Sequence, residues 1–147
     1  MKDVIHKHIN KANSLSEVRN ALIKALEEIK NTREITHIGY VSGIVSSDGI
    51  EYIKRNIQVL GQYTEKLKNI HKFPMFSAAD VLSEEIFLKI DGANLPTQVW
   101  FDFWRNILET GYITDIFMTP GWEASLGAKD EYETAQKLGI SIVILKE

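Results

Sequence analysis

From Thr32 to the end of the chain, short apolar runs alternate with segments of helical periodicity, and this alternation constrains the fold most strongly. Apolar residues three or four positions apart separate each run from the next, which is typical of helices between strands. Strands joined by helical crossovers pair in parallel. The sequence therefore predicts an α/β domain with a four-stranded parallel sheet, whose strands cover residues 35–41, 73–76, 113–118 and 140–145.

Residues 1–31 follow a different pattern, with no glycine or proline and with two apolar stripes at helical spacing. Ser14 stands three residues before Glu17, which is the spacing of a capping box and predicts a break between two helices. We therefore expect an N-terminal helical extension over residues 1–31 and an α/β domain over residues 32–147. The extension either packs on its own domain or contacts a partner, and both alternatives are open at this point.

Composition excludes several classes of protein. The 147 residues contain no cysteine, so disulfides, thiolate zinc sites and cysteine nucleophiles are excluded. A net charge of -3 argues against a nucleic acid polymer as partner. No apolar run approaches the ~20 residues that span a bilayer, and the N-terminus lacks a signal-peptide pattern. We expect a cytoplasmic protein that binds no membrane, no metal and no other cofactor.

Two loops are the expected ligand-binding segments, because parallel sheets bind ligands at the carboxyl ends of their strands. These loops cover residues 42–48 and 119–127, and both are rich in glycine and serine. The second loop leads into a predicted helix over residues 128–138, closed by Gly139. Its inward stripe comprises Ala128, Ala135 and Leu138, with Glu131 between the two alanines.

Glu131 is a candidate nucleophile. An unpaired carboxylate on an inward stripe is costly, so this side chain needs either partners or a function. A sheltered carboxylate near the mouth of a parallel sheet suits covalent catalysis. The alternative is that the helix dipole alone favours an acidic residue there, with Tyr132 facing inward instead.

The segment around Glu131 also resembles a known family. Residues 121–128 read Gly-Trp-Glu-Ala-Ser-Leu-Gly-Ala, and with Glu131 they resemble the signature of the nucleoside 2-deoxyribosyltransferase-like superfamily. The likeness is to its small uncharacterised bacterial and phage branch. Residues 40–43, Tyr-Val-Ser-Gly, resemble the opening motif of that branch, and Asp115 stands where these families keep an aspartate. The resemblance covers residues 35–145.

This resemblance implies a flavodoxin-like, three-layer α/β fold and chemistry at an N-glycosidic bond. Glu131 would attack the anomeric carbon of a nucleoside 5′-monophosphate or nucleoside, and Asp115 would assist. Ser125 would bind the 5′-phosphate of a nucleotide, and Trp122 would either stack on the base or pack against the sheet. The expected substrate-binding residues are Tyr40, Ser42, Gly43, Trp122, Ser125 and Gly127.

The chain departs from the family at two places. Ile44 stands where the branch usually has proline, and Ser46-Ser47 replaces a small residue and glycine. Transferases of the superfamily complete their site with a C-terminal segment from a neighbouring subunit, and the sequence ends at Glu147. That departure favours a nucleotide hydrolase over a deoxyribosyltransferase, with a non-catalytic nucleotide-binding module as a further alternative. The expected partners are a small nucleoside or nucleotide and a second copy of the chain in a homo-oligomer, a dimer.

Overall fold

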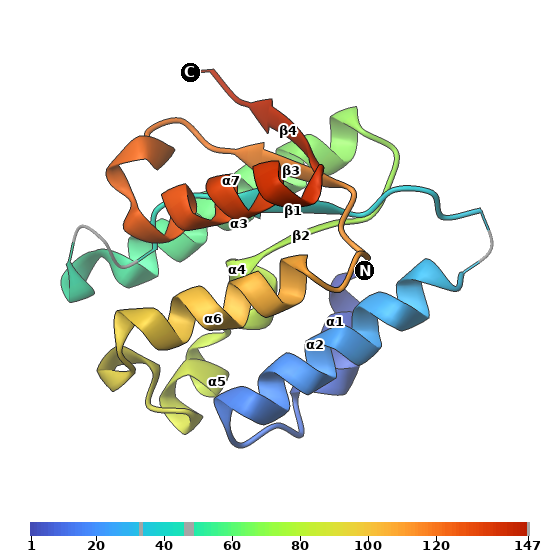
Figure 1. Cartoon of the computed structure of the whole chain (residues 1–147). Helices are drawn as coiled ribbons and strands as arrows, with labels where there is room; N and C mark the ends of the chain where they lie inside the picture. Colours follow the sequence, from blue (N-terminus) through green and yellow to red (C-terminus); the bar gives the residue numbers. More distant parts are fainter. Residues whose placement is uncertain (33, 46–48, 147) are drawn as a thin grey trace.

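A computed structural model shows a four-stranded parallel sheet between layers of helices (Figure 1). The structure describes residues 1–32, 34–45 and 49–146. The strand order β2-β1-β3-β4 is that of a four-stranded flavodoxin-like sheet, so the predicted α/β three-layer fold is confirmed. The strands are β1 (Gly39–Ser42), β2 (Met75–Ser77), β3 (Asp115–Met118) and β4 (Ser141–Ile144).

Helices cover both faces of the sheet. Figure 1 shows α3 behind the sheet and α7 in front of it. Right-handed crossovers require this arrangement, because the connection from β1 to β2 and the connection from β3 to β4 run in opposite directions across the sheet. On the front face α6 packs beside α7, and α2 packs against α6. The helices are α1 (Lys2–Ile9), α2 (Leu15–Lys30), α3 (Ile53–Ile70), α4 (Ala78–Val81), α5 (Glu84–Lys89), α6 (Thr97–Leu108) and α7 (Leu126–Leu138), with short 3-10 helices η1 (Ile50–Tyr52), η2 (Gly92–Asn94) and η3 (Trp122–Ala124).

The N-terminal helices share the hydrophobic core of the sheet. The predicted break is confirmed, because Ser14 caps α2 by accepting a hydrogen bond from the backbone N–H of Glu17 at 3.2 Å. The Glu17 carboxylate accepts one from the N–H of Asn13 at 3.0 Å. α1 packs on α2 and α4, so both helices pack on their own domain. Their fully buried side chains include Ile5, Val18, Leu22 and Leu26.

Element boundaries differ from the predictions mainly at strand ends. β1 begins at Gly39 rather than at residue 35, and α4 directly after β2 was not predicted. β2 lies at the sheet edge, as Pro74 before it indicates. Leu138 was expected on the inward stripe of α7, but it is 45% exposed near the end of that helix. Across the described residues, every helix is too short or too polar to cross a membrane.

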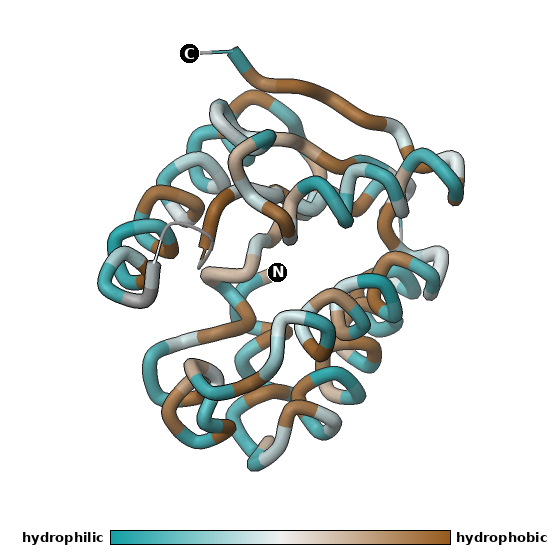
Figure 2. Tube along the Cα trace, turned by 60° about the vertical axis from the view of Figure 1, so that its left-hand side comes forward, coloured by the Kyte–Doolittle hydropathy of each residue, from teal (hydrophilic) through white to brown (hydrophobic). Residues whose placement is uncertain are grey.

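The opposite edge of the sheet, β4, is largely exposed. Val143 and Ile144 are 36% and 52% exposed, although both side chains are apolar. Figure 2 shows this C-terminal strand as a hydrophobic segment along the outside of the molecule. Among the described residues β4 pairs with β3 alone, so its other side is a free sheet edge in this part of the chain.

Candidate active site

A cavity of about 400 Å³ lies at the carboxyl end of β1, beside the start of α7. This is the position at which strand order reverses, since β1 has β2 on one side and β3 on the other. Both predicted loops reach it: the first contributes Gly43 and the second contributes Ser125. The described wall also includes Tyr40, Gly127 and Glu131, so five expected site residues meet here.

Glu131 lies in the second turn of α7 with its side chain directed to β1. It is 8% exposed, and its Oε1 accepts a hydrogen bond from the Ser42 hydroxyl at 3.0 Å. Burial raises the pKa of Glu131 to about 7, hydrogen bonds from Tyr40 and Ser42 act to lower it, and the charge of Asp130 raises it further. At neutral pH this carboxyl group is therefore divided between its ionised and protonated forms.

Tyr40 forms the floor of the cavity next to Glu131. Burial, and then the negative charge of Glu131, raise the pKa of the Tyr40 phenol well above its usual value. The phenol therefore stays protonated and can donate its hydrogen bond to the carboxylate. The ring is packed against Trp104 of α6 with 4.9 Å between centroids, which fixes its position.

Thr119, the residue directly after β3, holds Ser42 in place. The backbone N–H and the hydroxyl of Thr119 both donate to the Ser42 carbonyl, at 2.9 and 3.1 Å. Thr119 fits there because Gly43 has no side chain: a Cβ on Gly43 would lie 2.1 Å from the Thr119 hydroxyl oxygen. The glycine is thus required by a close approach between the two loops.

Ser125 caps the N-terminus of α7. Its hydroxyl oxygen accepts a hydrogen bond from the N–H of Ala128 at 3.1 Å, which starts the helix two residues earlier than the sequence predicts. Ser125 is 3% exposed and lines the cavity together with Gly127. This helix start is where an anionic group of a ligand would be favoured.

Four aromatic side chains, the aromatic wall, line the same cavity as Glu131; they are Phe87, Trp100, Phe101 and Trp104. Trp100 and Trp104 lie one turn apart on α6, and Phe87 of α5 stacks on Trp100 at 6.1 Å between centroids. The helical periodicity of residues 97–108 predicts that Trp100 and Trp104 lie on the apolar face of α6. It does not show whether that face packs in the core or lines a cavity. Phe87 follows no recognisable motif, and it reaches the cavity because it packs directly on Gly92.

A family described as "Domain of unknown function (DUF4406)" matches residues 67–144, which is more than half of the chain. The protein is a member of the DUF4406 family. No curated protein and no solved structure matches the chain. The DUF4406 segment contains β2, β3, β4, Ser125 and Glu131, whereas Tyr40, Ser42 and Gly43 precede it.

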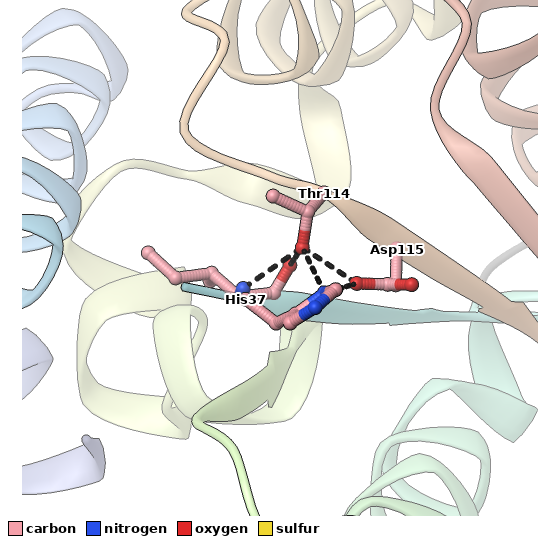
Figure 3. Close-up of polar contacts among 4 residues, drawn as sticks. His37, Thr114 and Asp115 are labelled. Atoms are coloured by element: carbon pink, nitrogen blue, oxygen red, sulfur yellow. Dashed lines mark hydrogen bonds and ion pairs between the residues drawn. The ribbon is translucent and has the colours of Figure 1, made fainter. Parts of the chain in front are cut away.

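The expected role of Asp115 in this DUF4406 protein needs correction. Asp115 is the first residue of β3 and pairs with Gly39, whereas the cavity lies at the other ends of these strands. Its carboxylate binds His37 Nδ1 at 2.9 Å and accepts a hydrogen bond from the Thr114 hydroxyl at 2.5 Å (Figure 3). Asp115 therefore joins the starts of β1 and β3 and cannot assist Glu131 directly.

Trp122 also lies outside the described cavity wall. Its ring stacks on Tyr132 with 4.7 Å between centroids, so it packs against the outer side of α7 and not on a ligand in this cavity. The Ser46-Ser47 pair of the first loop lies outside the described residues. Within the described residues, no three His, Asp or Glu side chains are grouped so that they could hold a metal ion.

Asp130 ties α7 to α6. It accepts two hydrogen bonds from the guanidinium of Arg105, one of them at 2.9 Å from Nε. The pair fixes the turn of α7 that carries Glu131. The positive charge of Arg105 also offsets the negative charge of Asp130, which lies beside Glu131. No sequence motif indicates this pair, because the two residues are 25 positions apart and only the packing of α6 on α7 brings them together.

Proposed function

We propose that the protein is an N-glycosidase that cleaves the glycosidic bond of a nucleoside 5′-monophosphate or nucleoside, with Glu131 as the nucleophile. The observation that carries this proposal is a buried carboxylate on the wall of a cavity at the carboxyl end of a parallel sheet. The resemblance of residues 121–128 and Glu131 to the nucleoside 2-deoxyribosyltransferase-like superfamily supports the same assignment.

The proposed reaction follows the two-step logic of a retaining glycosidase. An oxygen of ionised Glu131 bonds to C1′ of the sugar as the bond from C1′ to the base breaks. Water then cleaves the glycosyl ester and restores the carboxylate. Ser42 and Tyr40 orient the carboxylate by their hydrogen bonds, and the start of α7 at Ser125 would bind the 5′-phosphate of a nucleotide.

Chromatography of the free base released from a panel of nucleosides and nucleoside 5′-monophosphates tests this function. We expect Glu131→Gln to reduce kcat/KM by several orders of magnitude, as loss of a nucleophile does. Asp115→Asn is the matched control, because it makes the same change at the far end of the sheet. Undiminished release of base by the Glu131 variant would exclude Glu131 as nucleophile.

The same assay separates the alternatives within the superfamily. If a second free base is added to the reaction, a transferase attaches the sugar to that base. A hydrolase transfers the sugar to water and leaves the added base unchanged. Thermal stabilisation by a nucleotide without any product would instead indicate a binding module, since a ligand of the native state raises its apparent stability.

A further inference from the structure

The described side chains that line the cavity carry a negative charge when Glu131 is ionised and no positive charge. Among the described residues that line it, Glu131 alone has a charged side chain. Arginines of neighbouring elements are engaged outside the cavity: Arg105 pairs with Asp130, and the guanidinium of Arg55 lies 4.5 Å from the centre of the Tyr52 ring. A ligand group near Glu131 therefore meets a carboxylate and no described cation.

The aromatic wall of the same cavity adds to this preference. The faces of Trp, Tyr and Phe rings attract cations through their quadrupoles, and the attraction is strongest where water is excluded. Trp100, Trp104 and Phe87 contribute three such rings to the cavity that also contains the Glu131 carboxylate. This combination is suited to a flat, positively charged ring.

Among the described residues of the cavity wall, none offers a proton to a leaving base. A neutral nucleoside releases its base as an anion unless a general acid protonates the ring, and Asp115 is too remote to do so. The titratable side chains of the described wall are Glu131, which is the proposed nucleophile, and Tyr40. The Tyr40 hydrogen bond is directed to Glu131, and burial makes its phenol a weaker acid than usual.

We infer that this cavity selects a positively charged base, so that the preferred substrates are nucleosides of the N-alkylpyridinium or N-alkylpurinium class. The inference about substrates rests on the proposed function, whereas the selection of a cation by the cavity does not. Glu131 forms a bond to C1′ as the C1′–N bond breaks, and the electron pair of that bond passes to the ring nitrogen. The base leaves as a neutral molecule without a proton, and hydrolysis of the ester releases the sugar and one proton.

A binding experiment tests the selection without any turnover. 1-Methylnicotinamide and nicotinamide differ by one methyl group and one positive charge, and calorimetry at pH 8 gives the affinity of each. We expect the cation to bind at least tenfold more tightly, and we expect Glu131→Gln to remove that preference. Asp115→Asn is the control and keeps it. Equal or weaker binding of the cation would overturn the inference.

A second experiment tests the substrates by release of base. We expect kcat/KM for 7-methylguanosine and nicotinamide riboside to exceed that for guanosine and inosine by at least 100-fold, after correction for spontaneous cleavage in buffer. Equal cleavage of neutral and charged nucleosides would overturn the substrate inference and leave the glycosidase function intact. No release from any of these nucleosides or from their 5′-monophosphates would overturn the glycosidase function, and the calorimetry would still decide the cation preference.

Discussion

At Glu131, the proposed nucleophile, burial of the side chain destabilises the folded chain. Its pKa is about 7 in the folded protein, against 4.5 for an ordinary glutamate. Between these values the folded state holds a proton that the unfolded state has released. The free energy of unfolding therefore falls as pH rises from 4.5 to 7, and the loss is complete above pH 7.

Replacing Glu131 with glutamine should therefore stabilise the protein in a pH-dependent way. We expect Glu131→Gln to raise the free energy of unfolding by up to about 3 kcal/mol at pH 8, and to change it little at pH 4. Urea unfolding at both values measures the effect. Asp115→Asn should give no such gain, because Asp115 already has two partners. An equal effect at the two pH values would contradict the assignment of the shift to Glu131.

The same group should govern the pH dependence of catalysis. In the proposed reaction Glu131 must be ionised, so we expect kcat/KM to rise with pH through a midpoint at about 7 and to level off above it. Asp130→Asn removes a negative charge that raises the pKa of Glu131, so it should move the midpoint to lower pH. Rates measured from pH 5 to 9 decide this, and an unmoved midpoint would show that Asp130 does not act on the nucleophile.

Gly43 offers a test of the contact between the two loops. We expect Gly43→Ala to lower the free energy of unfolding by about 1–3 kcal/mol and to reduce activity, because the new methyl group displaces Thr119 and with it Ser42. Gly61→Ala is the matched control: it lies inside α3, where a Cβ has room at 3.8 Å from Ala79. That change should stabilise the protein by about 0.5–1 kcal/mol. Equal effects of the two substitutions on unfolding and activity would argue against the loop contact.

At the scale of elements, the sequence predicts the helix boundaries that are set by capping residues. The Ser14 cap fixes the start of α2, and the αL conformation of Gly139 fixes the end of α7, so both boundaries are readable from the residues themselves. The start of β1 is not readable, because residues 35–37 have strand-like side chains but no neighbouring strand to pair with.

The sequence predicts those parts of the candidate site that lie at the carboxyl ends of strands. Tyr40, Ser42 and Glu131 come together because β1 and the start of α7 meet at the point where strand order reverses. The error at Asp115 arises because a strand has two ends about 10 Å apart, and a motif read along the chain does not say which end carries the site. The aromatic wall depends on how α5 and α6 fold back over β1, which no local pattern specifies.

At the scale of the whole molecule, the N-terminal helices are part of a single core. Ile5 of α1 is fully buried in the same cluster as the strands, whereas Leu88 of α5 is 73% exposed. We expect Ile5→Ala to lower the free energy of unfolding by about 2–5 kcal/mol, and Leu88→Ala by less than about 0.5 kcal/mol. Denaturant unfolding followed by circular dichroism compares them, and equal losses would show that α1 is not part of the cooperative unit.

The open edge of β4 has a consequence for how the protein behaves in concentrated samples. Charged residues and prolines usually protect a free edge strand against aggregation by strand pairing. The run from Ser141 to Leu145 contains neither. The substitution Val143→Lys would place a charged side chain on this edge at a position that is already exposed. Light scattering during slow heating should then show the onset of aggregation at a higher temperature, even though nothing in the cavity has changed.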